Sequence, residues 1–358
     1  MIQTGVEKRM KRIESLAGMK VICMLLLFLW HGPFPHPKTD LGARTCEFLF
    51  LASGFLVAYN GFYKQVPATW AESFHYVGKK LADFWPLHAI TMLAVMFVFD
   101  NPILTQKNLI NGAINLLLLQ AWSEKTMFSY NGPTWFLSAL LFCYFLAPFL
   151  LRLAKNLRTS CFLFIFAYLV RAFVEYVVTA FPGQFWSINV HSFPIIRALE
   201  FTMGMMLVPL FMRINERDWG EQSYLVMSAL EIAALAGALW ATIHFNGIWR
   251  RFGFLLPYSA LLFVFAFDRG LLSRILSCKA AKWFSEIQFE FFILHEAIIS
   301  CFAPPLKRVI PKWSVGSVLF LITLVLAMLY KKYLRKSLSS LFVRVQNAVQ
   351  QILQVDLG

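Results

Sequence analysis

The chain has 358 residues, of which 59% are apolar and only 15% are charged, and Phe alone occurs 37 times. In soluble domains about a quarter of the residues are charged. This composition therefore excludes a disordered chain, a disulfide scaffold and an ordinary cytosolic enzyme. The formal net charge is +14. Since the sequence is rich in apolar stretches, the excess of Lys and Arg is typical of cytoplasmic loops in a membrane protein. No basic run alternates with aromatic residues, so we expect no nucleic-acid partner.

Repeated apolar stretches of about the length that crosses a bilayer predict an all-α, polytopic membrane helical bundle with about ten transmembrane helices. The predicted spans are 16–33, 42–59, 84–100, 133–151, 159–180, 192–212, 222–244, 251–268, 283–302 and 314–331. A further apolar segment, 109–122, is about fourteen residues long, which is typical of a short re-entrant or interfacial segment. We therefore expect that it does not span.

Positive charge indicates the orientation of this bundle. With ten spans, the inner segments hold more than twice as many Lys and Arg residues as the outer loops, which places both termini in the cytoplasm. The resulting organisation is a basic cytoplasmic N-terminus over 1–15, a transmembrane domain over 16–331 and an amphipathic cytoplasmic tail over 332–358. The six cysteines form no C-x-x-C pair, and we expect neither a metal site nor a disulfide framework.

Ionisable residues inside the predicted spans are unusual, because each charge costs at least a few kcal/mol at the bilayer centre unless it faces the bundle interior or a cavity. The spans and their ends hold ten such residues: His31, Glu47, His88, Arg171, Glu175, Arg197, Glu200, Glu231, Glu290 and His295. Arg171 and Glu175 are four residues apart and Arg197 and Glu200 are three apart, so each pair can neutralise its charges on one helix face. For Arg171–Glu175 a structural ion pair is the favoured interpretation. Glu231 and His88 have no obvious partner.

Lys20 and His31 have the most informative spacing. Eleven residues make about three helical turns, so both side chains share one face, about 16 Å apart along the axis. An imidazole exchanges protons near neutral pH, which suggests a catalytic base; the alternative is a snorkelling Lys20 and a His31 that only forms hydrogen bonds at the outer interface. Lys79 and Lys80, before the third span, fit either a topological anchor or a clamp for phosphate.

Five stretches of the sequence, taken together, form a further pattern. They are Leu16-Ala17-Gly18-Met19-Lys20 with His31; Phe50-Leu51-Ala52-Ser53-Gly54-Phe55-Leu56; Lys79-Lys80 with Phe84-Trp85-Pro86-Leu87-His88; Trp135-Phe136-Leu137-Ser138 with Tyr144, Pro148 and Arg197-x-x-Glu200-Phe201-x-x-Gly204; and Phe291-Phe292-Ile293-Leu294-His295. In this order and spacing they resemble the acyltransferase 3 family of bacterial integral-membrane O-acyltransferases. Two positions depart from the family pattern: Lys20 stands where the family usually has Arg, and Asp83 where a basic residue often precedes the proline.

The resemblance implies transfer of an acyl group, commonly acetyl, from cytoplasmic acyl-CoA to a hydroxyl of a cell-surface or lipid-linked carbohydrate, in the bacterial cytoplasmic (inner) membrane. His31 is then the general base, or it is itself acylated and passes the group on. Lys20, Lys79 and Lys80 are expected to bind the anionic nucleotide of acyl-CoA, the donor substrate. No metal is expected.

The remaining site residues also come from the resemblance. Arg197, paired with Glu200, or His295 is expected to stabilise the tetrahedral oxyanion. Trp135, Ser138 and Tyr144 are the expected substrate-binding residues, although plain helix packing is the simpler interpretation of Trp135 alone. The expected partners are the carbohydrate acceptor, acyl-CoA and membrane lipids. Formation of a homo-oligomer is left as an open alternative.

The main alternative is a transporter or flippase for lipid-linked sugars or small anions, because buried Arg/Glu pairs and broken helices suit such proteins. No inverted repeat is visible in the sequence, which favours the enzyme. A third interpretation, a membrane sensor, finds no recognisable output domain in 332–358.

Overall fold

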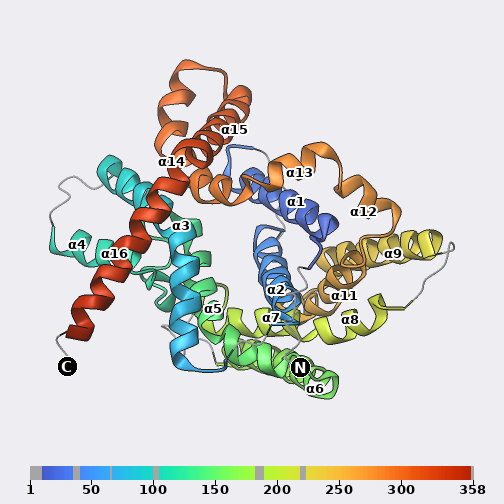
Figure 1. The fold of residues 1–358 in the computed structure, drawn as a ribbon. Coiled ribbons are helices and arrows are strands. Elements are labelled where there is room, and N and C mark those ends of the chain that lie inside the picture. Colours follow the sequence, from blue (N-terminus) through green and yellow to red (C-terminus); the bar gives the residue numbers. More distant parts are fainter. Residues whose placement is uncertain are drawn as a thin grey trace.

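A computed structural model of the protein describes residues 10–34, 41–64, 67–99, 105–181, 189–217 and 223–355. Throughout these ranges the regular structure is helical and no strand occurs, which confirms the predicted all-α class. The helices longer than seven residues, all visible in Figure 1, are α1 Glu14–His31, α2 Leu41–Gly61, α3 Trp70–Phe99, α4 Gln106–Leu116, α5 Trp135–Leu153, α6 Leu157–Ala180, α7 Pro194–Met206, α8 Val208–Asn215, α9 Ser223–His244, α11 Leu255–Phe265, α14 Gln288–Val309, α15 Lys312–Leu329 and α16 Arg335–Val355.

Eight helical stretches of the described chain are long and apolar enough to cross a membrane. They correspond to eight of the ten predicted spans and confirm a polytopic membrane bundle. The other two predicted spans are helical but differ: 42–59 lies in α2, which carries Arg44 and Glu47, and 251–268 is divided between α10 (Trp249–Phe252) and the eleven-residue α11. The count of about ten spans therefore stays a prediction.

The segment 109–122 does not form a single long helix, in agreement with the prediction from its length. It contains most of α4, which has eleven residues, and then η1 (Gln120–Trp122), a single 3-10 turn. Two side chains of α3 hold the end of α4: Trp85 Nε1 donates to the carbonyl of Leu116, and His88 Nε2 contacts the carbonyl of Asn115, each at 2.8 Å. His88 thus receives a structural partner that sequence reasoning did not supply.

Helices α2 and α7 approach each other more closely than any side chain would allow. A Cβ atom on Gly54 would overlap the carbonyl of Phe201, and one on Gly204 would overlap the carbonyl of Leu51. Small residues let helix backbones come together in this way. About two turns along the same contact, Glu47 of α2 faces Arg197 of α7 at 3.6 Å. The paired glycines therefore bring the charged side chains of Glu47 and Arg197 close to each other.

The predicted tail helix is present as α16. It continues from α15 through one π-helical turn, η3 (Tyr330–Leu334), and runs across α3 (Figure 1). Arg335 contacts Asp83 at 3.5 Å and Glu290 at 2.8 Å, and the ring of Phe342 lies 5.1 Å from that of Trp85. The tail is thus fastened to α3 and α14 by charge and by ring packing.

Glu231 of α9 also receives a partner that spacing alone could not show. Its carboxylate accepts hydrogen bonds from the backbone N–H groups of Gly270, Leu272 and Ser273 and from the Ser273 hydroxyl. These groups begin the short helix α12 (Leu271–Leu276). A carboxylate at a helix N-terminus satisfies N–H groups that have no partner within the helix, so this buried charge is structural.

The glycine contact can be tested by adding one methyl group. We expect Gly54→Ala and Gly204→Ala each to lower the stability of the protein by about 1–3 kcal/mol, the usual cost of overpacking, measured as a lower thermal midpoint in detergent. Gly237→Ala in α9 is the matched control, because a Cβ there meets nothing within 4 Å and Ala favours a helix. Equal midpoints for Gly54→Ala and Gly237→Ala would contradict the close contact.

Candidate active site

Helix α1 ends on His31. The N–H of Gly32 caps the helix by donating to the carbonyl of Phe28 at 2.8 Å, and Pro33 follows, which cannot continue the backbone hydrogen-bond pattern. His31 is half-buried, in the last turn of a helix that buries much of its length. The sequence thus fixes a histidine at a helix end.

His295 of α14 lies against His31. Its Nε2 is 3.1 Å from Nδ1 of His31, and its Nδ1 contacts the carbonyl oxygen of Phe292. A carbonyl can only accept a hydrogen bond, so Nδ1 of a neutral His295 carries the proton and its Nε2 accepts. Nδ1–H of His31 then donates to His295, and Nε2 of His31 is left with a lone pair. The contacts therefore orient His31 as a proton acceptor.

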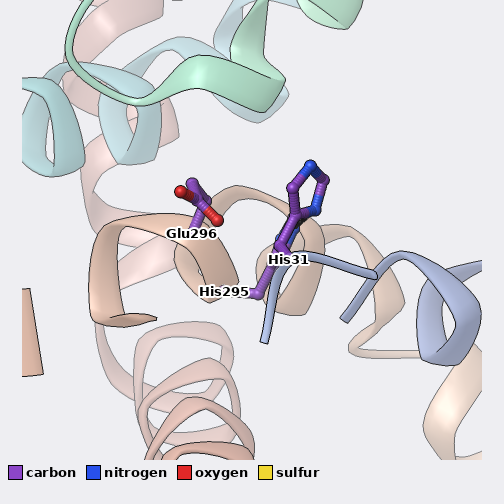
Figure 2. A group of neighbouring side chains, drawn as sticks. All are labelled: His31, His295 and Glu296. Atoms are coloured by element: carbon purple, nitrogen blue, oxygen red, sulfur yellow. Dashed lines mark hydrogen bonds between the residues drawn. The ribbon is translucent and has the colours of Figure 1, made fainter. Parts of the chain in front are cut away.

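Glu296 is the third member of this cluster (Figure 2). It comes from α14 like His295, and one carboxylate oxygen accepts from the Ser300 hydroxyl at 3.1 Å. The other oxygen is buried and has no hydrogen-bond partner within the described chain. Ligand atoms of His31, His295 and Glu296 lie within 4.8 Å of one another, close enough to hold a metal ion. The expectation of no metal stays a prediction.

A cavity of about 540 Å³ opens beside the cluster; we call it the histidine cavity. His31, Glu296 and Ser300 line it, together with apolar and aromatic side chains that include Trp135. The ring of Trp135 lies 4.7 Å from that of His191, which lines the cavity too. Trp135 therefore faces the cavity, as a substrate-binding residue must, and it also packs against Phe50 and Phe136.

A second cavity, of about 610 Å³, adjoins the first; we call it the arginine cavity. Its described lining includes five arginines and two glutamates, namely Arg44, Arg171, Arg197, Arg250, Arg251, Glu47 and Glu175. Ala43 and His191 line both cavities. The histidine cluster and the arginines therefore occupy neighbouring spaces.

Buried ion pairs join the helices around the arginine cavity. Arg171 donates to Glu175 at 2.6 Å, which confirms the predicted pair, and also to Glu200 at 3.2 Å. Arg197 donates to Glu200 at 2.7 Å, and the Glu47 carboxylate lies 3.6 Å from Arg197. The pairs Arg171–Glu175 and Arg197–Glu200, joined by Glu47, thus form one network across α2, α6 and α7.

Arg197 and Glu200 do not touch the histidines. The second guanidinium nitrogen of Arg197 donates to the carbonyl of Val190 at 3.0 Å, so its terminal nitrogens are engaged within the network. The structure therefore places Arg197 in the wall of the neighbouring cavity and Glu200 in the ion-pair network behind it, rather than beside His31.

Ser138 and Tyr144 occupy positions different from that of Trp135. The Ser138 hydroxyl donates to the carbonyl of Leu118 at 2.6 Å and accepts from Ala121 N–H, so it joins α5 to η1 and to the turn before it. Tyr144 lies with Lys80, whose ammonium is 5.3 Å from the Tyr144 ring and 5.5 Å from that of Tyr76. Tyr144, which was predicted to bind the substrate, and Lys80, which was predicted to bind acyl-CoA, thus belong to a single cation–π cluster.

Of the other predicted donor residues, Lys79 is exposed on α3. Lys20 is half-buried on α1 and forms no hydrogen bond or ion pair with the described residues. Helix α3 begins at Trp70, well before the predicted span, so Lys79 and Lys80 lie within the helix and not in a loop ahead of it.

Sequence reasoning missed Glu296, His191 and Arg44 as site residues. Glu296 directly follows His295, and that adjacency was a usable signal. His191 lies just before α7, outside any periodic segment, and the sequence offers no signal for it. Arg44 is three residues from Glu47, at a spacing that allows an ion pair on a helix, and the structure shows that contact.

These features define an integral membrane protein whose helices enclose a histidine-based site. A family model for the acyltransferase 3 domain, described as an acyltransferase domain, matches residues 13–332, nearly the whole chain. The chain belongs to the acyltransferase 3 family and is a membrane acyltransferase. Comparison with curated proteins gave no match, and comparison with solved structures gave none.

The role of Glu200 can be separated from chemistry by stability. We expect Glu200→Gln to lower the thermal midpoint strongly, because removing one partner of a buried ion pair costs on the order of 3–5 kcal/mol. Glu286→Gln is the control: its carboxylate is 59% exposed and pairs with Lys331, and exposed pairs contribute at most about 1 kcal/mol. A Glu200→Gln protein as stable as the control would mean that the network does not depend on this carboxylate.

Proposed function

We propose that the protein transfers an acyl group, acetyl in the simplest case, from cytoplasmic acyl-CoA to a hydroxyl of a cell-surface or lipid-linked carbohydrate. The observation that carries this proposal is the contact between His31 and His295 at the wall of the histidine cavity. It supplies an oriented base at a space large enough for a sugar hydroxyl and a thioester. The proposed location is the bacterial inner membrane, with both termini in the cytoplasm.

In the proposed step His31 acts as general base. Nε2 takes the proton of the acceptor hydroxyl while the hydroxyl oxygen attacks the thioester carbonyl carbon. The new C–O bond forms, the C–S bond breaks, and the departing thiolate of CoA takes the proton back from the imidazolium. Through this cycle the Nδ1–H of His31 donates to His295, which stabilises the positive charge as it develops. An acyl-histidine route would use the same nitrogen as nucleophile.

His295 is better suited to positioning than to oxyanion stabilisation. Its Nδ1–H is directed at the carbonyl of Phe292 and its Nε2 accepts from His31. A neutral His295 therefore has no N–H left for an oxyanion. Its contact resembles the general arrangement in which a third group orients the catalytic base.

The donor would enter from the inner end of the bundle. Lys20 lies on the same helix as His31, about three turns away, and an acyl-pantetheine arm that ran along this helix would join the two. The Lys80 ammonium among the Tyr76 and Tyr144 rings offers a second cation for the anionic nucleotide. Lys79, exposed beside it, offers a third.

The His31 hypothesis is tested by His31→Gln, which keeps a polar side chain but cannot take the proton. We expect the rate of acyl transfer to fall by about 10²–10⁴-fold while expression and acetyl-CoA binding persist. The measurement is release of free CoA from acetyl-CoA in proteoliposomes, together with mass analysis of surface glycans in cells that carry the variant. The wild-type rate should fall on the acid side as the imidazole becomes protonated and can no longer accept the proton.

The control for His31 is His244→Gln, an exposed histidine on α9, which should leave the rate unchanged. A His31→Gln protein with the wild-type rate would contradict both the general-base and the acyl-histidine mechanisms.

The donor lysines give a separate test. We expect Lys79→Ala combined with Lys80→Ala to weaken acetyl-CoA binding more than it slows the reaction at saturating donor, because lost phosphate contacts are shared by the ground and transition states. Lys155→Ala, an exposed lysine on the same predicted side, is the control. Unchanged donor affinity in direct binding would assign Lys79 and Lys80 to membrane topology alone.

A further inference from the structure

The arginine cavity is lined by arginines with donors that the described residues leave unsatisfied. The Arg197 side chain is fully buried and lines the cavity, and its Nε has no hydrogen-bond partner within the described chain. Arg251 is half exposed at the same cavity, and its closest carboxylate, that of Glu175, is 3.6 Å away, beyond hydrogen-bond distance. The Nε–H of Arg197 and the guanidinium of Arg251 therefore have hydrogen-bonding capacity that the described residues do not use.

The chemistry of these donors selects a class of ligand. A guanidinium presents N–H groups in a planar fork that matches a carboxylate or a phosphate. Positive side chains outnumber negative ones in the described lining of this cavity, so an anion is favoured over a cation or a neutral group. A purely structural role would require only that the ion pairs close on one another, whereas here they border a space of about 610 Å³.

The position of the cavity connects this ligand with the reaction. His191 and Ala43 line both cavities, and Trp135 packs on His191 at 4.7 Å. An anionic group in the arginine cavity would therefore lie beside the histidine cavity, and the rest of the same molecule could extend toward it. There His31 holds the proposed proton acceptor.

We propose that the acceptor is an anionic carbohydrate, and that the arginine cavity binds its carboxylate or phosphate while a neighbouring hydroxyl reaches His31. The identification of this ligand as the acceptor rests on the proposed function. The anion site itself rests on Arg197, Arg251 and the cavity that they line.

The experiment compares three probes on the purified full-length protein: methyl glucuronide, methyl glucoside 6-phosphate and neutral methyl glucoside. Affinities are measured by calorimetry at fixed ionic strength. We expect at least one anionic probe to bind about tenfold or more tightly than the neutral sugar, the effect of one charge-assisted hydrogen bond. The two anionic probes distinguish a uronate-type from a phosphate-bearing acceptor.

Arg251→Gln should remove most of this preference without loss of the fold, because the Arg251 side chain is half exposed. Arg308→Gln, an exposed arginine in the last turn of α14, is the matched control and should keep the preference. Equal affinity for charged and neutral sugars, no binding of either anion, or an unchanged preference in Arg251→Gln would each overturn the anion site.

Release of CoA from acetyl-CoA, measured on the same preparation, separates the two proposals. Selective anion binding without CoA release in any condition would support the site and count against the acyl-CoA-dependent reaction. CoA release with no charge preference in binding would leave the proposed function standing and overturn the anionic acceptor.

Discussion

The site depends on the close contact of α2 with α7. Gly54 and Gly204 each lie against a backbone carbonyl of the other helix, where any side chain would overlap it. That approach brings Glu47 to Arg197, and Arg197 and Arg171 share the carboxylate of Glu200. In an apolar bundle a charge that lost its partner would be costly to bury. The glycines therefore determine whether the Glu47 carboxylate of α2 can join the ion pairs of Arg197 and Arg171.

The histidine pair depends on a different kind of constraint. His31 stands at the end of α1 and His295 within α14, 264 residues further along the chain. The carbonyl of Phe292 fixes which nitrogen of His295 carries the proton, and this in turn fixes the tautomer of His31. A backbone group inside one helix thus determines which nitrogen of the histidine at the end of another keeps its lone pair, without any charged residue in the chain of contacts.

Local patterns predicted most of the helices because hydropathy and length act within a single segment. They also predicted the Arg171–Glu175 pair, whose partners lie one turn apart on α6. The start of α3 was missed, because its first turns are polar enough to fall outside a hydropathy window, and Pro86 is accommodated inside the helix. Hydropathy also did not predict the break between α10 and α11, which divides one apolar stretch into two helices.

Contacts between distant helices had no counterpart in the sequence. The partner of Glu231 is the start of α12 and that of Glu290 is Arg335 of α16, and neither spacing is helical. For the same reason the sequence could name His31, His295, Arg197 and Glu200 as unusual residues but could not divide them between the histidine cluster and the arginine network. Only the packing of α2 against α7 and of α1 against α14 makes that division.

Two cavities with separate internal contacts allow separate tasks. The histidines bond to each other and to a backbone carbonyl, whereas the arginines bond to glutamates and to the carbonyl of Val190. No hydrogen bond between the two groups occurs among the described residues, and the described walls that they share are Ala43 and His191. A change in the arginine cavity can therefore alter what is bound without altering the tautomer of His31. In the proposed function, this arrangement would let one histidine pair serve different acceptors, because the histidines and the arginines are carried by different helices.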